Sequence, residues 1–244
     1  MRFDNVQILS VSHVEAPHTV DSDEIESTLE ATMKRLGVPS GMIQRFSGIE
    51  SRRHFDETMP PSEAATTAGE KAIEAAGIDR DRLGVVVNTS VTRDFVEPST
   101  ASIVHRNLGL APTCLNFDIS NACLAFINGM EMVGNMIEQR QIDVGIVVNA
   151  ENMKYATQRT IERLSRPDAT WEAFRDAFAT LTLGSGAVAM VLSRAQGLTG
   201  EHRFLGGVNL AATQHCRLCY AQVDNMVTNA KKLLNHGMEL ALKT

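Results

Sequence analysis

Two short stretches of the chain are apolar without interruption, and they constrain the fold more than any other feature. They read LGVVVNTSV at 83–91 and DVGIVVNAE at 143–151. A strand with one face in water alternates apolar and polar residues, so continuous apolar strands of this length are covered on both faces. Three more strands are predicted along the chain, in NVQILSVSH, TCLNFDIS and GSGAVAMVLSRA.

Helical patterns separate these strands. Residues 21–36 carry apolar side chains at four-residue steps before Gly37, and residues 62–76 begin at a capping Ser62. Helices are also predicted over 98–108, with a proline in the first turn, and over 121–140. Strands that alternate with helices predict an α/β fold, in which a mostly parallel sheet carries helices on both faces.

The pattern also predicts how the chain divides into domains. Residues 152–182 are mixed and polar, and we interpret them as an insertion or lid within a first domain of residues 1–196. After the connection AQGLTGEH, the segment RFLGGVNLAAT predicts a new strand and residues 223–243 a helix, much as the chain began. Residues 197–244 are therefore expected to start a second half-domain that is incomplete in this sequence.

Composition argues against several classes of partner. The net charge of −6 leaves no basic footprint for nucleic acid or an anionic membrane. No apolar run approaches the roughly 20 residues of a membrane span, and the first residues lack a charged and then apolar leader. The four cysteines do not suggest a disulfide scaffold, so a reduced, cytoplasmic location is expected.

One of these cysteines, Cys123, falls where a predicted strand runs into a predicted helix. The thiolate is the reactive form of cysteine, and the N–H groups and dipole at a helix N-terminus stabilise it. Ligands of open α/β sheets also bind beyond the carboxyl ends of strands. The spacing also fits a buried cysteine that fills space near a helix start, which is the commoner case, so both interpretations stay open at this level.

The segment DISNACLAFINGM around Cys123 resembles the nucleophile segment of the thiolase superfamily, in its β-ketoacyl-ACP synthase III branch. FSGIESRR, the long run from AGEKAIEAAG to IVHRNLGL, DVGIVVNAEN and GSGAVAMVLSRA resemble the same branch in the same order. SVTRDFVEPSTAS, GSGAVA and HRFLGGVNLAATQHCRLC are most similar to the OleA-type thiolases, which condense acyl-CoA at the start of head-to-head hydrocarbon synthesis. The resemblance implies a thiolase-like fold.

It also implies a reaction. Cys123 would accept a fatty acyl group as a thioester, and a second long-chain acyl-CoA (or acyl-ACP) would lose its alpha proton and attack that thioester. Glu97 in DFVEPST matches a glutamate that reaches the partner's site in a homodimer and helps to remove this proton. Without the resemblance, Glu97 reads as an acid stabilised at a helix N-terminus beside Pro98. The product would be a 2-alkyl-3-oxo acid, and no cofactor or metal is expected.

The resemblance is incomplete. The family also uses a histidine, an asparagine and a glycine-rich loop of the second half-domain, and their motifs lie beyond the end of this sequence. His13, His54, His105, His202, His215 and His236 match none of these motifs and are assigned no role. We consider, in this order, a fragment of a longer protein, one subunit of a split enzyme and a degenerate binding chain. The incomplete half-domain predicts exposed apolar surface and poor solubility.

Two other functions stay open for the chain. A decarboxylating synthase that uses malonyl-ACP needs no base for the alpha proton, and a non-catalytic subunit of a heteromeric synthase needs no nucleophile.

The Cys-x-x-Cys pair Cys216 and Cys219 lacks a second pair of ligands at zinc spacing. Arg45, Arg52 and Arg53 are candidates for phosphate contacts, although solvated loop arginines are the commoner case, and none is assigned.

Overall fold

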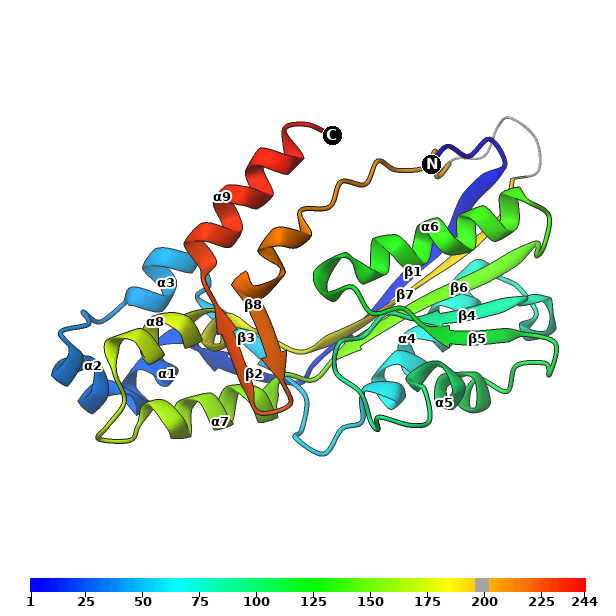
Figure 1. The fold of residues 1–244 in the computed structure, drawn as a ribbon. Helices are drawn as coiled ribbons and strands as arrows, with labels where there is room; N and C mark the ends of the chain where they lie inside the picture. The colour runs from blue at the N-terminus through cyan, green and yellow to red at the C-terminus, as the bar shows by residue number, and fades with distance from the viewer. Residues whose placement is uncertain (196–201) are drawn as a thin grey trace. The chain divides into compact units, whose positions relative to one another are not determined.

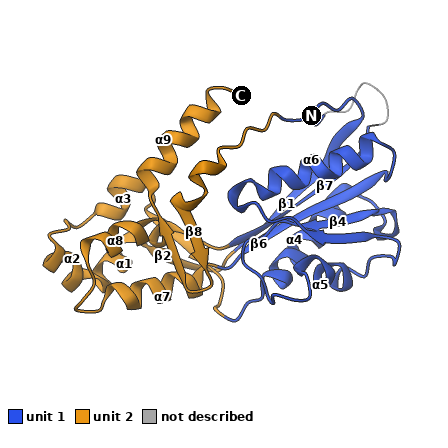
Figure 2. Cartoon of the chain, in the orientation of Figure 1, with its two compact units in different colours: residues 1–15, 58–152, 186–207 blue, residues 16–57, 153–185, 208–244 orange. Residues whose placement is uncertain are grey.

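The structure is a computed structural model that describes residues 1–195 and 202–244. The chain forms two compact units, each built from segments far apart in the sequence (Figure 2). Unit 1 comprises residues 1–15, 58–152 and 186–207, and unit 2 comprises residues 16–57, 153–185 and 208–244. The predicted boundary between residues 196 and 197 lies outside the described residues, so the division into half-domains stays a prediction.

Unit 1 is organised around a five-stranded sheet with the order β1-β7-β6-β4-β5 (Figure 1). The strands are β1 (Val6–Glu15), β4 (Val85–Asn88), β5 (Leu115–Asp118), β6 (Val144–Glu151) and β7 (Gly186–Arg194). Strand β4 is parallel to β5 and to β6, whereas β7 is antiparallel to both of its neighbours. The five strands predicted before residue 196 are therefore all present, in a mixed sheet.

Helices cover both faces of this sheet, which confirms the predicted α/β architecture (Figure 1). Helices α4 (Pro61–Ala76) and α5 (Thr100–Asn107) pack on one face and α6 (Ala125–Glu138) on the other. The core under α6 joins Phe3, Val85, Val133, Val147 and Leu192, all of them buried. Strand β4 is buried at every position, as its uninterrupted apolar sequence predicts.

Unit 2 has its own apolar core, formed by helices from both ends of its sequence. Its elements are β2 (His18–Asp21), α1 (Ser22–Thr28), α2 (Glu30–Leu36), α3 (Met42–Ser47), β3 (Ser51–His54), α7 (Lys154–Leu164), α8 (Trp171–Ala177) and the 3₁₀ segment η3 (Phe178–Thr182). Leu164, Phe174 and Leu181 pack with Ile25 and Leu29. The polar stretch 152–182 thus contributes a buried face to a core, and whether it also acts as a lid stays a proposal.

The ends of several helices differ from the sequence predictions. The helix predicted over 21–36 breaks at Leu29 into α1 and α2 and ends at Gly37, whose left-handed φ of 69° makes it the predicted stop. Helix α5 begins at Thr100 because Ser99, whose side chain accepts from the Ser102 N–H, is its N-cap. Helix α4 starts at Pro61, one residue before the predicted cap.

The last part of the chain differs most. The predicted strand RFLGGVNLAAT makes only isolated bridges, at Arg203 and at Gly206, whose φ of 112° interrupts an extended chain. The helix predicted over 223–243 is shorter, because the hairpin β8 (Cys219–Gln222) and β9 (Asn225–Thr228) precedes it. Helix α9 (Ala230–Ala241) starts after Asn229, whose side chain accepts from the Lys232 N–H. Two further 3₁₀ segments are η1 (Arg80–Arg82) and η4 (Thr213–Leu218).

No helix within residues 1–195 and 202–244 is long and apolar enough to cross a membrane.

Candidate active site

Cys123 lies in a short turn between the last residue of β5 and the first turn of α6. This turn is the 3₁₀ segment η2 (Ala122–Leu124), and Cys123 is exposed in it. The predicted helix over 121–140 is wrong at its start, because Ala122 adopts a left-handed φ of 46° that no right-handed helix contains. Such a conformation in a residue with a side chain costs about 1–3 kcal/mol and is concentrated at functional sites.

Side chains of α6 are hydrogen-bonded to Asn121, the residue before this turn. The Asn121 Nδ2 donates to Asn128 Oδ1 at 2.6 Å, and the Asn128 Nδ2 donates to Glu131 Oε2 at 3.4 Å. Glu131 is buried, with 3% of its surface exposed. The turn is therefore tied to the body of α6 through a chain of polar contacts, and the cysteine itself is left free of them.

The position of Cys123 suits a reactive thiol. Its side chain is exposed, and it lies two residues before the first residue of α6. Cys114 has a contrasting environment one strand earlier. Burial raises the pKa of the Cys114 thiol to about 11, an effect that a backbone hydrogen bond from Val86 offsets only in part.

Glu97 is exposed on the loop between β4 and α5, beside the exposed apolar residues Phe95 and Val96. The loop is anchored before this point by Asp94, which accepts from the N–H of Ser62 at 3.0 Å and from its hydroxyl. Glu151, at the end of β6, accepts from the backbone N–H of Val91 at 2.7 Å. The anchors leave the tip of the loop, with Glu97, projecting from unit 1.

Asp118, the last residue of β5, joins the loop of Glu97 to the segment of Cys123. Its carboxylate accepts the backbone N–H groups of Thr100 at 3.1 Å and of Ala101 at 2.8 Å. No hydrogen bond within the described residues joins Glu97 to Cys123 themselves. The sequence analysis did not single out Asp118, Asp94 or Glu151, because each of them acts through hydrogen bonds to another segment of the chain.

The candidate residues to which no role was assigned have structural contacts. His54 is buried and its Nδ1 lies 3.3 Å from the hydroxyl of Ser185. The Arg52 guanidinium is also buried and donates to the carbonyl of Val20 and the hydroxyl of Ser22. In the hairpin of unit 2, the Cys219 sulfur lies 3.3 Å from the hydroxyl of Thr228.

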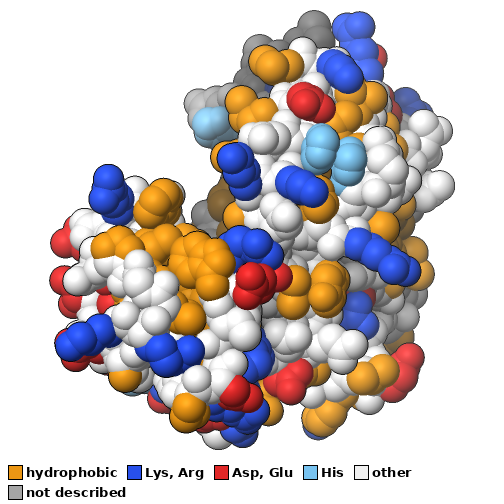
Figure 3. Space-filling view, turned by 60° about the vertical axis from the view of Figure 1, so that its left-hand side comes forward, with side chains coloured by type: hydrophobic (Ala, Val, Ile, Leu, Met, Phe, Trp, Pro, Cys, Tyr) orange, Lys and Arg blue, Asp and Glu red, His pale blue; other side chains and the backbone are white. Residues whose placement is uncertain are grey.

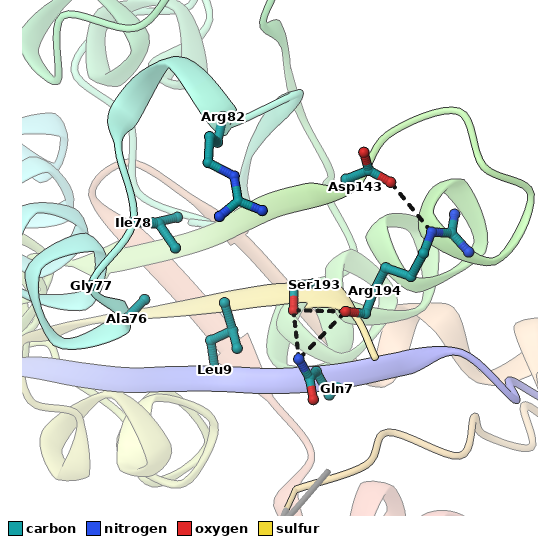
Figure 4. A pocket seen from close by; sticks show the side chains of 9 residues that line it. All are labelled: Gln7, Leu9, Ala76, Gly77, Ile78, Arg82, Asp143, Ser193 and Arg194. Carbon is teal, nitrogen blue, oxygen red and sulfur yellow. Dashed lines mark hydrogen bonds and ion pairs between the residues drawn. The ribbon is translucent and has the colours of Figure 1, made fainter. Parts of the chain in front are cut away.

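Unit 1 contains a cavity of about 480 Å³ (Figure 4). It is lined by Gln7, Leu9, Ala76, Gly77, Ile78, Arg82, Asp143, Ser193 and Arg194. Arg82 lies three residues before β4 and Asp143 directly precedes β6, so the cavity lies at the amino ends of the parallel strands. Cys123 follows the carboxyl end of β5, at the opposite edge of the sheet. The cavity is therefore separate from the candidate active site.

Comparison with known proteins identifies close relatives. The sequence profile of the thiolase N-terminal domain matches residues 44–203. The acyl-CoA:acyl-CoA alkyltransferase of Xanthomonas campestris is 45% identical over 244 residues, which are 100% of this chain and 72% of that protein. The enzyme of the same description from Shewanella oneidensis is 37% identical and matches 100% of this chain and 73% of its own length. A β-ketoacyl-ACP synthase III of Ehrlichia canis is 27% identical over 76% of this chain and 51% of its own.

Solved structures give the same result. A crystal structure of Xanthomonas campestris OleA with bound lauric acid and lauroyl-CoA superposes with a TM-score of 0.95 at 44% identity, over 99% of this chain and 72% of that one. Other structures of that OleA carry substitutions at a cysteine, at a glutamate and at a histidine.

Proposed function

Because the chain belongs to the thiolase family, we propose that it loads a fatty acyl group onto Cys123 and joins it to a second long-chain acyl-CoA. The observation that carries this proposal is the placement of Cys123, exposed on a strained turn before α6, in a chain 45% identical to an acyl-CoA:acyl-CoA alkyltransferase. The same exposed position is hard to explain for a cysteine that merely fills a core.

In the first step the Cys123 thiolate attacks the carbonyl carbon of an acyl-CoA. The bond from that carbon to the CoA sulfur breaks, CoA leaves as its thiolate, and the acyl group stays on Cys123 as a new thioester. The energy of one thioester is conserved in another, so this step needs no other source of energy.

In the second step another acyl-CoA loses its alpha proton and its carbanion attacks the Cys123 thioester, which releases the thiolate. Glu97 is the proposed base. In the OleA structures the substituted glutamate and the substituted cysteine are separated by the same number of positions as Glu97 and Cys123. Hydrolysis of the remaining thioester then gives a 2-alkyl-3-oxo acid.

The active unit is proposed to be a homodimer, in which Glu97 acts in the partner's site. Strand β5 is at the edge of the sheet and exposes Leu115, and the tip of the nearby loop exposes Phe95 and Val96 beside Glu97. An unpaired edge and an apolar loop tip are features that a second copy of the chain would cover. The four free cysteines support a reduced, cytoplasmic location.

A second half-domain, of which residues 197–244 would form the start, is proposed to complete the site. Helix α6 exposes Ile127 and Met132 with 50% and 43% of their surfaces accessible, and Leu124 of η2, just before it, is 56% exposed. Apolar side chains also gather in patches on the face drawn in Figure 3.

Intact-mass spectrometry with myristoyl-CoA tests the proposal. Wild type is expected to gain one myristoyl group, Cys123→Ala none, and the matched control Cys216→Ala, which removes another exposed cysteine, one. Glu97→Gln is expected to be acylated normally and to form no condensation product. An adduct that persists in Cys123→Ala, or folded wild type that is never acylated, contradicts the proposal.

A further inference from the structure

Asp118 occupies a place between the two candidate catalytic residues that the proposed chemistry does not use. It ends β5 five residues before Cys123, and it binds the start of α5, three residues after Glu97. Strand β5 and helix α5 lie side by side in unit 1 (Figure 1). The same carboxylate therefore contacts both segments that carry the proposed reaction.

Both carboxylate oxygens of Asp118 are engaged. Oδ1 accepts from the Ala101 N–H at 2.8 Å and from the Asn88 Nδ2 at 3.3 Å, and Oδ2 accepts from the Thr100 N–H at 3.1 Å. Asn88 is fully buried and its own Oδ1 accepts from the Ser90 hydroxyl at 2.7 Å. The carboxylate is thus held from the interior of the sheet and presents its oxygens to α5.

The N–H groups that Asp118 accepts belong to the first turn of α5, where the helix supplies no acceptor. Ser99 is the other cap of this turn and accepts from the Ser102 N–H at 3.2 Å. The two caps differ in one respect. Ser99 belongs to the loop itself, whereas Asp118 belongs to β5 and fixes the helix start to the strand that leads to Cys123.

We propose that Asp118 is a positioning residue that fixes the loop of Glu97 to β5 and so sets where this loop presents Glu97 to the partner's site. The inference rests on the proposed function, since it assigns Asp118 to the condensation step. The loop is anchored before its tip by Asp94 and after its tip by Asp118, with Phe95, Val96 and Glu97 projecting between. The Cys123 turn has attachments of its own through Asn121 and α6. Loss of the Asp118 bridge therefore moves Glu97 more than Cys123.

Asp118→Asn in the full chain tests this proposal, with Ser99→Ala as the matched control. Asparagine keeps the size of the side chain, but its amide can accept with one oxygen only, so one N–H of Thr100 or Ala101 loses its acceptor. Ser99→Ala removes a cap from the same helix and leaves the bridge to β5 intact. Acylation of Cys123 and formation of the condensation product are measured separately, with hydrogen–deuterium exchange of residues 98–102.

Asp118→Asn is expected to be acylated within about threefold of the wild-type rate and to condense about 10- to 100-fold more slowly, the loss typical of a base misplaced by about 1 Å. Exchange at Thr100 or Ala101 is expected to rise, whereas Ser99→Ala is expected to keep condensation within about threefold of wild type. A purely structural cap would lower both steps equally, or would make the two variants alike, and either result overturns the proposal. Wild-type condensation in Asp118→Asn overturns it as well.

The outcome separates this proposal from the proposed function. Wild-type chain that is never acylated at Cys123 contradicts the proposed function, whatever Asp118 does. In that case hydrogen–deuterium exchange still tests whether Asp118 holds the start of α5. Unchanged exchange at Thr100 and Ala101 in Asp118→Asn would show that the carboxylate does not hold the start of α5.

Discussion

Gly129 of α6 lies where the helix that follows Cys123 comes closest to the sheet. A Cβ added at this position would lie 2.9 Å from Thr89 Cγ2 and 2.9 Å from Val147 Cγ1. Both neighbours are fully buried branched side chains, so neither can rotate away into solvent. The substitution Gly129→Ala therefore requires α6 to move outward, and α6 begins two residues after Cys123.

The size of the effect can be worked out from these distances. Contacts of 2.9 Å must open by about 0.5 Å to reach the 3.4 Å of ordinary van der Waals contact. Overpacking of this kind costs about 1–3 kcal/mol, and alanine in place of glycine returns about 1 kcal/mol of helix propensity. We expect a net loss of about 1 kcal/mol in the free energy of unfolding.

Gly237→Ala on α9 is the matched control, because an added Cβ there meets nothing within 4 Å. It is expected to raise the stability of α9 by up to about 1 kcal/mol and to leave Cys123 acylation unchanged. Urea unfolding followed by circular dichroism gives the stabilities, and intact-mass spectrometry gives the acylation rates, which are expected to fall for Gly129→Ala. A Gly129→Ala protein as stable as wild type and acylated at the same rate would refute the reasoning.

Three further predictions follow from buried groups. Burial, with contributions from Arg52 and Lys154, lowers the pKa of His54 below 6.5, so the unfolded chain binds the proton first. The free energy of unfolding should therefore fall as pH drops below about 6.5. His54→Asn should reduce this fall. Equal pH profiles of wild type and His54→Asn would contradict the prediction. Iodoacetamide at about pH 8 should label Cys123 but spare Cys114, whose pKa is about 11 in its buried position. Peptide mapping of the treated protein measures the labelling. Equal labelling of the two cysteines would refute the burial of Cys114. The Thr100 hydroxyl is buried without a hydrogen-bond partner. In urea unfolding, Thr100→Val should therefore leave the stability unchanged or raise it by up to about 1 kcal/mol. A loss of more than about 1 kcal/mol would show that the hydroxyl has a partner.

The sequence by itself determined the architecture of unit 1. The uninterrupted apolar runs at 83–91 and 143–151 became the buried strands β4 and β6, because only a strand covered on both faces tolerates such a run. The resemblance around Cys123 predicted the thiolase fold, which the relatives confirm. Local signals also set single boundaries, such as the end of α2 at Gly37.

Other features depended on contacts that no local pattern contains. The antiparallel direction of β7 follows from its pairing with β1 and β6, which lie far from it in the sequence. The polar segment 152–182 joined a core with residues near the start of the chain, since its buried Leu164 and Phe174 pack with Ile25 and Leu29. The sequence of neither segment indicates that it packs against the other.

The candidate site shows the same division. Cys123 and Glu97 could be named from the sequence, because their surroundings resemble a family. Asp118 could not, because its role lies in two backbone N–H groups that come within reach only when α5 packs beside β5. The sequence determines which groups carry the chemistry, whereas hydrogen bonds between distant segments determine where those groups are held, and these bonds exist only in the folded chain.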